Sequence, residues 1–184
     1  MTGYDLPTKA EINGKEWDIR SDYRAALDII GVMNDAELSD KERGIIVMAI
    51  FYPDFEDMNQ SDYQEAINYV YWFIGGGEKD EAQQKKPRLI DWEQDFPLIV
   101  SPVNRVIGYE IRSIDYLHWW TFLSAYYEIG ECLFSQVVGI RQKKAKHKKL
   151  DKSDEEFYRA NRKIIDIQQT YTAEEEDTIS KWMV

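Results

Sequence analysis

The stretch from Ile114 to Gly130, IDYLHWWTFLSAYYEIG, limits the folds open to this 184-residue chain more than any other part of its sequence. Consecutive residues on a helix point about 100° apart, so Trp119 and Trp120 cannot share one narrow apolar stripe. Two adjoining stripes cover most of the helix: Leu117, Trp120, Leu123 and Tyr127 form one, and Tyr116, Trp119, Leu123 and Tyr126 form the other.

Two interpretations of this aromatic helix stay open. Either it is the central helix of a bundle, enclosed by its neighbours, or one of its faces is free for a partner, because aromatic residues dominate both cores and interfaces. We favour the enclosed position, in which His118 is a hydrogen-bonded polar neighbour of the core. The partner-facing alternative names four candidate binding residues: Trp119, Trp120, Phe122 and Tyr126.

A β-hairpin is predicted near the N-terminus. Two short alternating segments, residues 9 to 12 and 15 to 19, flank Asn13-Gly14, a pair that tolerates the two positive φ angles of a type I′ turn. The expected inward side chains are Ile12, Trp17 and Ile19.

Helix start and stop signals predict a mainly α-helical bundle behind this hairpin. Ser39-Asp-Lys-Glu42 is a capping box for a helix that ends before Pro53. Pro97 and Pro102 predict a kink or a break in the helix that follows Asp91. The full set of predicted N-terminal caps is Ser21 or Asp22, Ser39, Ser61, Asp91, Asp115 and Ser153.

One internal boundary is visible in the stretch GGGEKDEAQQKKPR, which has no apolar periodicity and reads as a loop or linker. We therefore expect one domain overall, with four segments along it. These are a hairpin with three helices (residues 1 to 74), the linker or loop (75 to 88), a helical region around the aromatic helix (89 to 170) and an acidic tail (171 to 184).

Charge is distributed unevenly. The net charge is −11, yet residues 141 to 149, RQKKAKHKK, hold six of the 23 basic residues and no acid, so the remainder carries −17. A body this acidic repels phosphate backbones, which disfavours a nucleic-acid partner. The basic run is either the solvated end of a helix or a dock for an acidic partner. Its lysines could also pair within the chain with the acids that follow, Asp151, Asp154, Glu155 and Glu156, or with the acidic stretch 174 to 177. The candidate docking residues are Arg141, Lys143, Lys144, Lys148 and Lys149.

Residues that could perform catalysis are scattered. His118 and His147 are 29 positions apart and suggest neither a metal pair nor a triad. Asp91 and Asp95 share a helix face, but acids at a helix N-terminus are more simply explained by the helix dipole. The triple glycine at 75 to 77 lacks the Gly-Lys-Ser/Thr of a phosphate-binding loop. We expect no enzymatic activity, cofactor or metal.

The chain is expected to act in the cytoplasm. It has a single cysteine, and its start, MTGYDLPTKAEING, has no apolar segment typical of a secretory signal. No apolar run approaches the ~20 residues that span a bilayer, so no membrane partner is expected.

Several stretches resemble a known family. LIDWEQDF, NRVIGYEIR, LHWWTF and VVGIRQKKAKHKKLDK, all between residues 85 and 167, and LPTKAEINGKEWDIRSDYRAALDII near the start are similar to the bacteriophage "gene product fifteen" family. Its members are small proteins of long-tailed phages and prophages of Gram-positive bacteria.

The resemblance implies a gene beside that of the tape-measure protein and a role in tail morphogenesis in the host cytoplasm. The expected function is that of a tail assembly chaperone, which coats the tape-measure protein until tail-tube subunits polymerise and is absent from the finished virion. Further copies of the chain or another tail assembly protein are additional candidate partners. The alternatives are a structural tail component retained in the virion and, less favoured, a nucleic-acid-binding regulator that uses residues 141 to 149.

Overall fold

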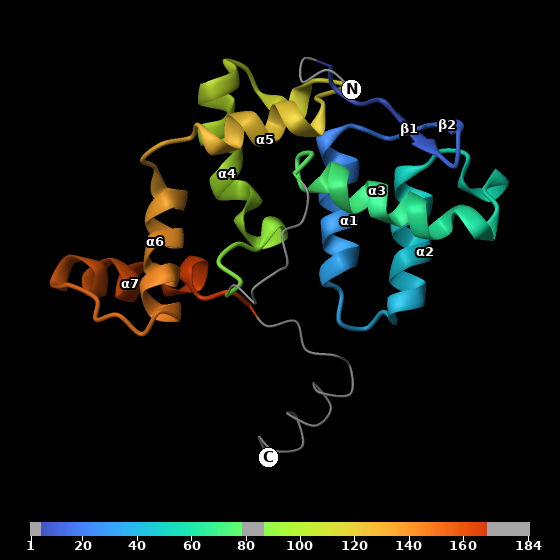
Figure 1. Cartoon of the computed structure of the whole chain (residues 1–184). Helices are drawn as coiled ribbons and strands as arrows, with labels where there is room; N and C mark the ends of the chain where they lie inside the picture. Colours follow the sequence, from blue (N-terminus) through green and yellow to red (C-terminus); the bar gives the residue numbers. More distant parts are fainter. Residues whose placement is uncertain (1–4, 79–86, 169–184) are drawn as a thin grey trace. The chain divides into compact units, whose positions relative to one another are not determined.

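The computed structural model describes residues 5 to 78 and 87 to 168, shown in colour in Figure 1. The predicted class is confirmed in these residues, because 62% of them are helical and they form a short antiparallel hairpin near the N-terminus. The strands are β1 (Lys9–Ile12) and β2 (Lys15–Asp18), and the helices are α1 (Tyr23–Asn34), α2 (Asp40–Phe51), α3 (Tyr63–Ile74), α4 (Trp92–Ile107), α5 (Trp119–Tyr127), α6 (Leu133–Ala145) and α7 (Lys152–Ile165).

The described residues fall into two compact units, and each is treated by itself below. The first unit contains residues 5 to 78 and Tyr116–Trp120, and the second contains residues 87 to 115 and 121 to 168. The division between Trp120 and Thr121 falls inside α5. The predicted segment boundaries stay predictions, and the predicted acidic tail lies outside the described residues.

The hairpin of the first unit has the predicted turn. Asn13 and Gly14 adopt φ angles of 48° and 77°, and Ala10 pairs with Trp17 across the strands. The Asn13 side chain donates to Asp62 at 2.7 Å and its backbone N–H to Glu65 at 3.1 Å, which holds the turn against the start of α3. The predicted inward residues Ile12, Trp17 and Ile19 are buried.

Local signals begin α1 and α2 as predicted. The Asp22 carboxylate accepts the Arg24 N–H at 2.9 Å, and Ser39 and Glu42 form both bonds of the capping box. The prediction for α3 was wrong, since a 3-10 turn at Gln60–Asp62 precedes the helix and Ser61 lies within that turn. The main apolar core of these helices is Ala26, Ile29, Val47, Met48, Phe51, Ala66, Val70 and Phe73.

Helix α4 opens the second unit and runs without a break through Pro97 and Pro102, so the predicted break is absent. Each proline removes only one backbone donor from the helix. The Asp91 carboxylate caps the N-terminus of the helix by accepting from the N–H groups of Glu93 and Gln94, which have no partner within the helix. Tertiary packing also stabilises α4, because the residues around the prolines are buried: Asp95, Ile99, Val100, Pro102 and Val103.

The predicted caps of α5 and α7 were both wrong by a few residues. Asp115 lies four residues before α5, which begins at Trp119, and Ser153 lies inside the first turn of α7. The Asp151 carboxylate caps α7 by accepting the N–H of Asp154 at 2.9 Å. Serine and aspartate cap almost equally well, so tertiary position decides between nearby candidates.

Backbone pairing explains the late start of α5. Leu117 accepts from the N–H of Tyr23 at 2.9 Å, and the Trp119 N–H donates to the carbonyl of Ser21 at 2.8 Å. The Leu117 N–H donates to the Asp22 carboxylate, which therefore both caps α1 and binds the segment before α5. This pairing keeps residues 117 and 118 extended, and the helix begins only after it.

Candidate functional site

The two tryptophans of LHWWTF bind the end of α3 within the first unit. Trp119 Nε1 donates to the carbonyl of Ile74 at 3.0 Å, and Trp120 Nε1 donates to the carbonyl of Phe73 at 2.8 Å. These are the last two residues of α3, where carbonyls have no partner within the helix. Gly77 follows with φ at 87°, and a Cβ there would approach the Trp120 ring to 2.8 Å. The tandem tryptophans therefore act as an indole cap for α3.

His118 connects the same cluster to the N-terminal segment. Its Nδ1 accepts the backbone N–H of Trp120 at 3.0 Å, as the side chain of an N-terminal cap does. The other ring nitrogen, Nε2, lies 2.9 Å from the carbonyl of Pro7 and must therefore carry the proton. The residue is only 3% exposed, and burial lowers the pKa of its imidazole. The expectation of a satisfied polar neighbour of the core is confirmed.

The predicted aromatic binding residues pack inside the units. Trp119 and Phe122 are buried, and Trp120 is half-buried. In the second unit the half-buried Tyr126 ring lies 5.0 Å from that of Trp92, and burial raises the pKa of its hydroxyl to about 12. The next residue, Tyr127, is 73% exposed. A role of the four predicted residues in partner binding stays a prediction.

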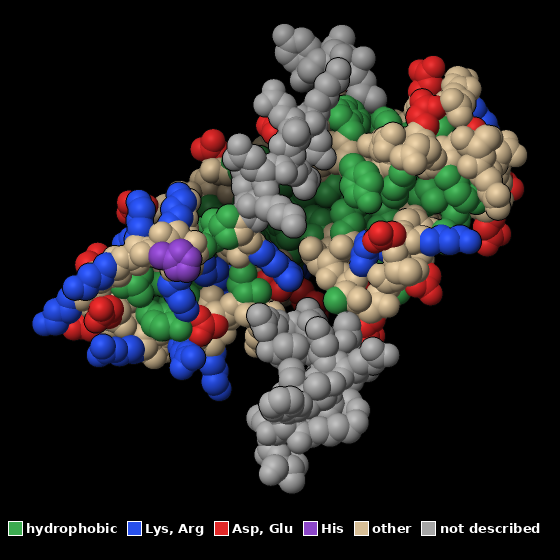
Figure 2. All heavy atoms as spheres, turned by 60° about the horizontal axis from the view of Figure 1, so that its bottom comes forward, with side chains coloured by type: hydrophobic (Ala, Val, Ile, Leu, Met, Phe, Trp, Pro, Cys, Tyr) green, Lys and Arg blue, Asp and Glu red, His purple; other side chains and the backbone are tan. Residues whose placement is uncertain are grey.

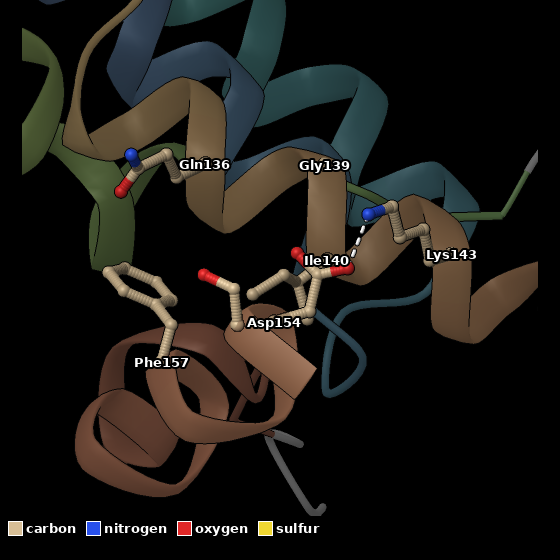
Figure 3. Close-up of a pocket in the computed structure, with 7 residues that line it drawn as sticks. Gln136, Gly139, Ile140, Lys143, Asp154 and Phe157 are labelled. Carbon is tan, nitrogen blue, oxygen red and sulfur yellow. Dashed lines mark hydrogen bonds and ion pairs between the residues drawn. The ribbon is translucent and has the colours of Figure 1, made fainter. Parts of the chain in front are cut away.

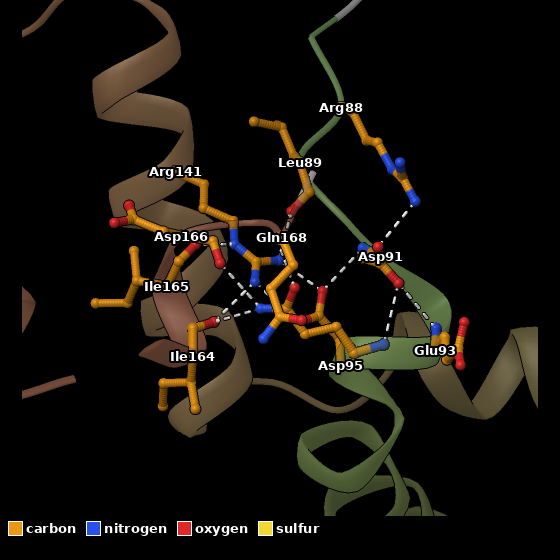
Figure 4. A network of polar contacts seen from close by, with 11 residues as sticks. Arg88, Leu89, Asp91, Glu93, Asp95, Arg141, Ile164, Ile165, Asp166 and Gln168 are labelled. Atoms are coloured by element: carbon orange, nitrogen blue, oxygen red, sulfur yellow. Dashed lines mark hydrogen bonds and ion pairs between the residues drawn. The ribbon is translucent and has the colours of Figure 1, made fainter. Parts of the chain in front are cut away.

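Arg141, the first residue of the basic run, lies inside the second unit and uses all five of its donors there (Figure 4). Its two Nη atoms bind both carboxylate oxygens of Asp95, at 2.5 and 2.9 Å. The remaining bonds go to the backbone carbonyls of Leu89, Ile164 and Ile165. The buried pair therefore connects α6 to the start of α4 and to the end of α7.

The sequence pattern did not reveal this pair. Asp95 was attributed to the helix dipole, whereas its carboxylate is fully buried, accepts the Asp91 N–H at 2.9 Å and neutralises Arg141. Asp95 and Arg141 are 46 positions apart, and neither position is marked by a motif. An arginine at the start of a lysine run was the only available signal.

The next two basic residues form exposed or half-buried ion pairs. Lys143 pairs with Asp154 and lies 3.8 Å from Asp151, and the hydrogen bond with Asp154 raises the pKa of its ammonium group. Lys144 donates to Asp166 at 2.6 Å and to the hydroxyl of Tyr158 at 2.8 Å. The intramolecular pairing considered from the sequence is therefore confirmed for Asp151 and Asp154, whereas Glu155 pairs with Arg159 of its own helix.

The end of the basic run is exposed. His147 lies two residues after the end of α6 and adopts the left-handed region, with φ at 52°. The Lys148 N–H donates to the carbonyl of Lys143 at 2.9 Å. Figure 2 shows Lys and Arg side chains gathered on the α6 and α7 side of the surface. Four exposed lysines form no ion pair with the residues that the structure describes: Lys146, Lys148, Lys149 and Lys152.

A hollow with a volume of about 270 Å³ lies between α6 and α7 (Figure 3). Its apolar wall is formed by Ile140 and Phe157, and the Lys143–Asp154 pair closes one side. The other lining residues are Gln136, Gly139 and Ser153. The hollow and the exposed lysines form a candidate binding surface on the described residues.

A family model described as Bacteriophage Gp15 protein matches residues 4 to 167. The chain belongs to this phage protein family. Comparison of this Gp15-family protein with curated proteins and with solved structures found no match.

Residues 5 to 78 and 87 to 168 contain no group of three or more His, Cys, Asp or Glu side chains placed to hold a metal ion. Within the same ranges, every helix is too short or too polar to traverse a lipid bilayer.

Proposed function

We propose that this Gp15-family protein is a tail assembly chaperone, which binds the tape-measure protein during phage tail morphogenesis in the host cytoplasm. The observation that carries the proposal is the family match over residues 4 to 167, which includes nearly the whole chain. The role is one of binding, without catalysis or a cofactor.

The surface of the first unit supports such a role. On α2, Ile45 and Ala49 are exposed and Ile46 and Ile50 are half-buried, so apolar side chains continue around the helix beyond its buried face. A chaperone for a long, mainly helical client needs apolar contacts of moderate size, because it must release the client later. The other exposed large apolar residues of the first unit are Leu6, Tyr71 and Tyr116.

Coexpression with the neighbouring tape-measure protein tests the proposal. The client should move from the insoluble to the soluble fraction and copurify with the chain in stoichiometric amounts. Expression of the client alone and with an unrelated acidic helical protein provides the controls. Unchanged client solubility in the presence of the chain would reject a chaperone role, and detection of the chain in purified virions would indicate a structural tail component instead.

The basic run, residues 141 to 149, favours a second candidate, a nucleic-acid-binding regulator. Binding through Lys143, Lys144, Lys148 and Lys149 should be strong at low ionic strength and should weaken steeply as salt is added. Neutralising these four residues should abolish it. An absence of RNA and DNA binding at low salt would eliminate this candidate.

A further inference from the structure

The face of α6 that borders the hollow contains a glycine that the fold does not require. Gln136, Gly139, Ile140 and Lys143 recur at the spacing of one helix face. An added Cβ at Gly139 would have no atom within 4 Å, and its φ is not in the positive region. Glycine inside a helix is less stable than alanine. The absence of a side chain at Gly139 therefore leaves space in the hollow that a larger residue would occupy.

The surroundings of the hollow are strongly cationic. Residues 141 to 163 contain ten Lys and Arg and four Asp and Glu, a net of +6, while the rest of the chain carries −17. Lys146 is the C-terminal cap of α6, three residues after the lining residue Lys143, and Lys152 precedes the lining residue Ser153 at the start of α7. An apolar hollow with exposed ammonium groups around it is complementary to an acidic partner that carries an apolar side chain.

We propose that the α6–α7 hairpin binds an acidic amphipathic helix of the client. One apolar side chain of that helix enters the hollow against Ile140 and Phe157, and its carboxylates lie near Lys146, Lys148, Lys149 and Lys152. A helix is the best occupant because the groove between two packed helices receives the side-chain ridge of a third. This inference rests on the proposed chaperone function and locates its binding surface.

The acidic residues of the hairpin favour protein over nucleic acid as the partner. Asp154 lines the hollow, and Asp151, Glu155 and Glu156 lie within five residues of it. These carboxylates repel a phosphate backbone, as does the charge of −17 elsewhere in the chain. A peptide helix can direct its carboxylates to the lysines and its apolar residue to the hollow, whereas a phosphate chain is charged along its whole length.

The test uses copurification of the coexpressed tape-measure protein with variants of the full chain. Gly139→Leu fills the hollow without loss of helix propensity and should reduce client binding about tenfold or more. The matched control is Gly31→Leu in α1, where an added Cβ also has no neighbour within 4 Å, and it should leave client binding unchanged. Thermal unfolding of both variants checks that each folds at least as well as the parent.

A charge-reversal variant tests the lysines independently. Lys146→Glu combined with Lys148→Glu and Lys149→Glu should also weaken client binding about tenfold, and the residual binding should lose its dependence on salt. If the parent solubilises the client and both variants do so equally well, the chaperone function stands and the hairpin site is wrong. If the parent itself has no effect on the client, the proposed function fails first.

Two other occupants give distinguishable results. Removal of residues 171 to 184, which contain Glu174, Glu175, Glu176 and Asp177, would strengthen client binding several-fold if the chain's own acidic tail filled the hollow. RNA binding that is lost with the lysine variant, together with unchanged client binding, would indicate nucleic acid. Either result would overturn an acidic client helix as the occupant.

Discussion

The aromatic run LHWWTF and the basic run RQKKAKHKK both supplied candidate partner-binding residues, and the two runs differ in how the fold uses them. Each of His118, Trp119 and Trp120 bonds through a ring nitrogen to a backbone carbonyl of the first unit. The basic run is divided, since Arg141 is buried while Lys148 and Lys149 are exposed. Residue type alone therefore does not decide whether a side chain faces inward, and the polar atoms of an aromatic residue can be structural.

The largest effect is expected at the centre of the aromatic run. Trp119→Ala removes a side chain that is 1% exposed and leaves the Ile74 carbonyl without its indole donor. The change should lower the free energy of unfolding by ~4 to 5 kcal/mol, measured by urea denaturation. Tyr127→Ala, on the exposed side of the same helix, is the control and should change stability by less than ~0.5 kcal/mol. A stable Trp119→Ala variant that no longer binds its client would instead make this ring an interface anchor.

Loss of Arg141 should be nearly as damaging, in contrast to the lysines after it. Arg141→Met leaves the buried Asp95 carboxylate without its cation, which should destabilise the protein by ~3 to 4 kcal/mol. Lys148→Met should be almost neutral, because that side chain is exposed and forms no ion pair with the described residues.

A double variant sharpens this result. Asp95→Leu combined with Arg141→Met removes both charges and should recover part of the stability lost by Arg141→Met alone. Equal stability of Arg141→Met and the parent would show that the pair contributes nothing. Urea unfolding of the two single variants, the double variant and the parent completes the cycle.

The imidazole of His118 predicts a pH dependence of stability that originates in the aromatic run. Burial lowers the pKa of His118 from its ordinary value of 6.5, so the unfolded chain binds the proton more readily than the folded one. Stability is fully present above about pH 6.5 and falls as the pH decreases from there toward the folded pKa, by at most ~1.4 kcal/mol per pH unit.

His118→Asn isolates this contribution, because asparagine keeps an acceptor for the Trp120 N–H but does not titrate in this range. The free energy of unfolding of the parent should decrease more steeply than that of the variant between about pH 6.5 and 5. Parallel curves would show that protonation of His118 is not linked to folding.

The smallest predicted effect is at the turn of the basic run. His147 has a positive φ of 52° at the end of α6, a position that glycine occupies without strain. His147→Gly should therefore raise the melting temperature by a few degrees, corresponding to ~0.5 to 1 kcal/mol. His147→Ala, which retains a Cβ, should give no such gain, and equal melting temperatures of the glycine and alanine variants would exclude backbone strain as the cause.

The sequence by itself determined the features that depend on residues a few positions apart. Asn13-Gly14 forms the predicted turn, Ser39 and Glu42 form the capping box, and Asp91 begins α4. The helical class and the family also follow from the sequence. These signals succeed because the atoms that form each turn or cap are already close along the chain.

Only the tertiary structure decided which residues meet over long separations. The indole of Trp120 bonds to Phe73, 47 positions away, and Arg141 to Asp95, 46 positions away. Because Leu117 pairs with Tyr23, α5 begins later in the sequence than predicted. Tertiary packing keeps α4 continuous through its two prolines. A buried polar group must find a partner wherever the fold brings one, and neither burial nor that partner is encoded in local spacing.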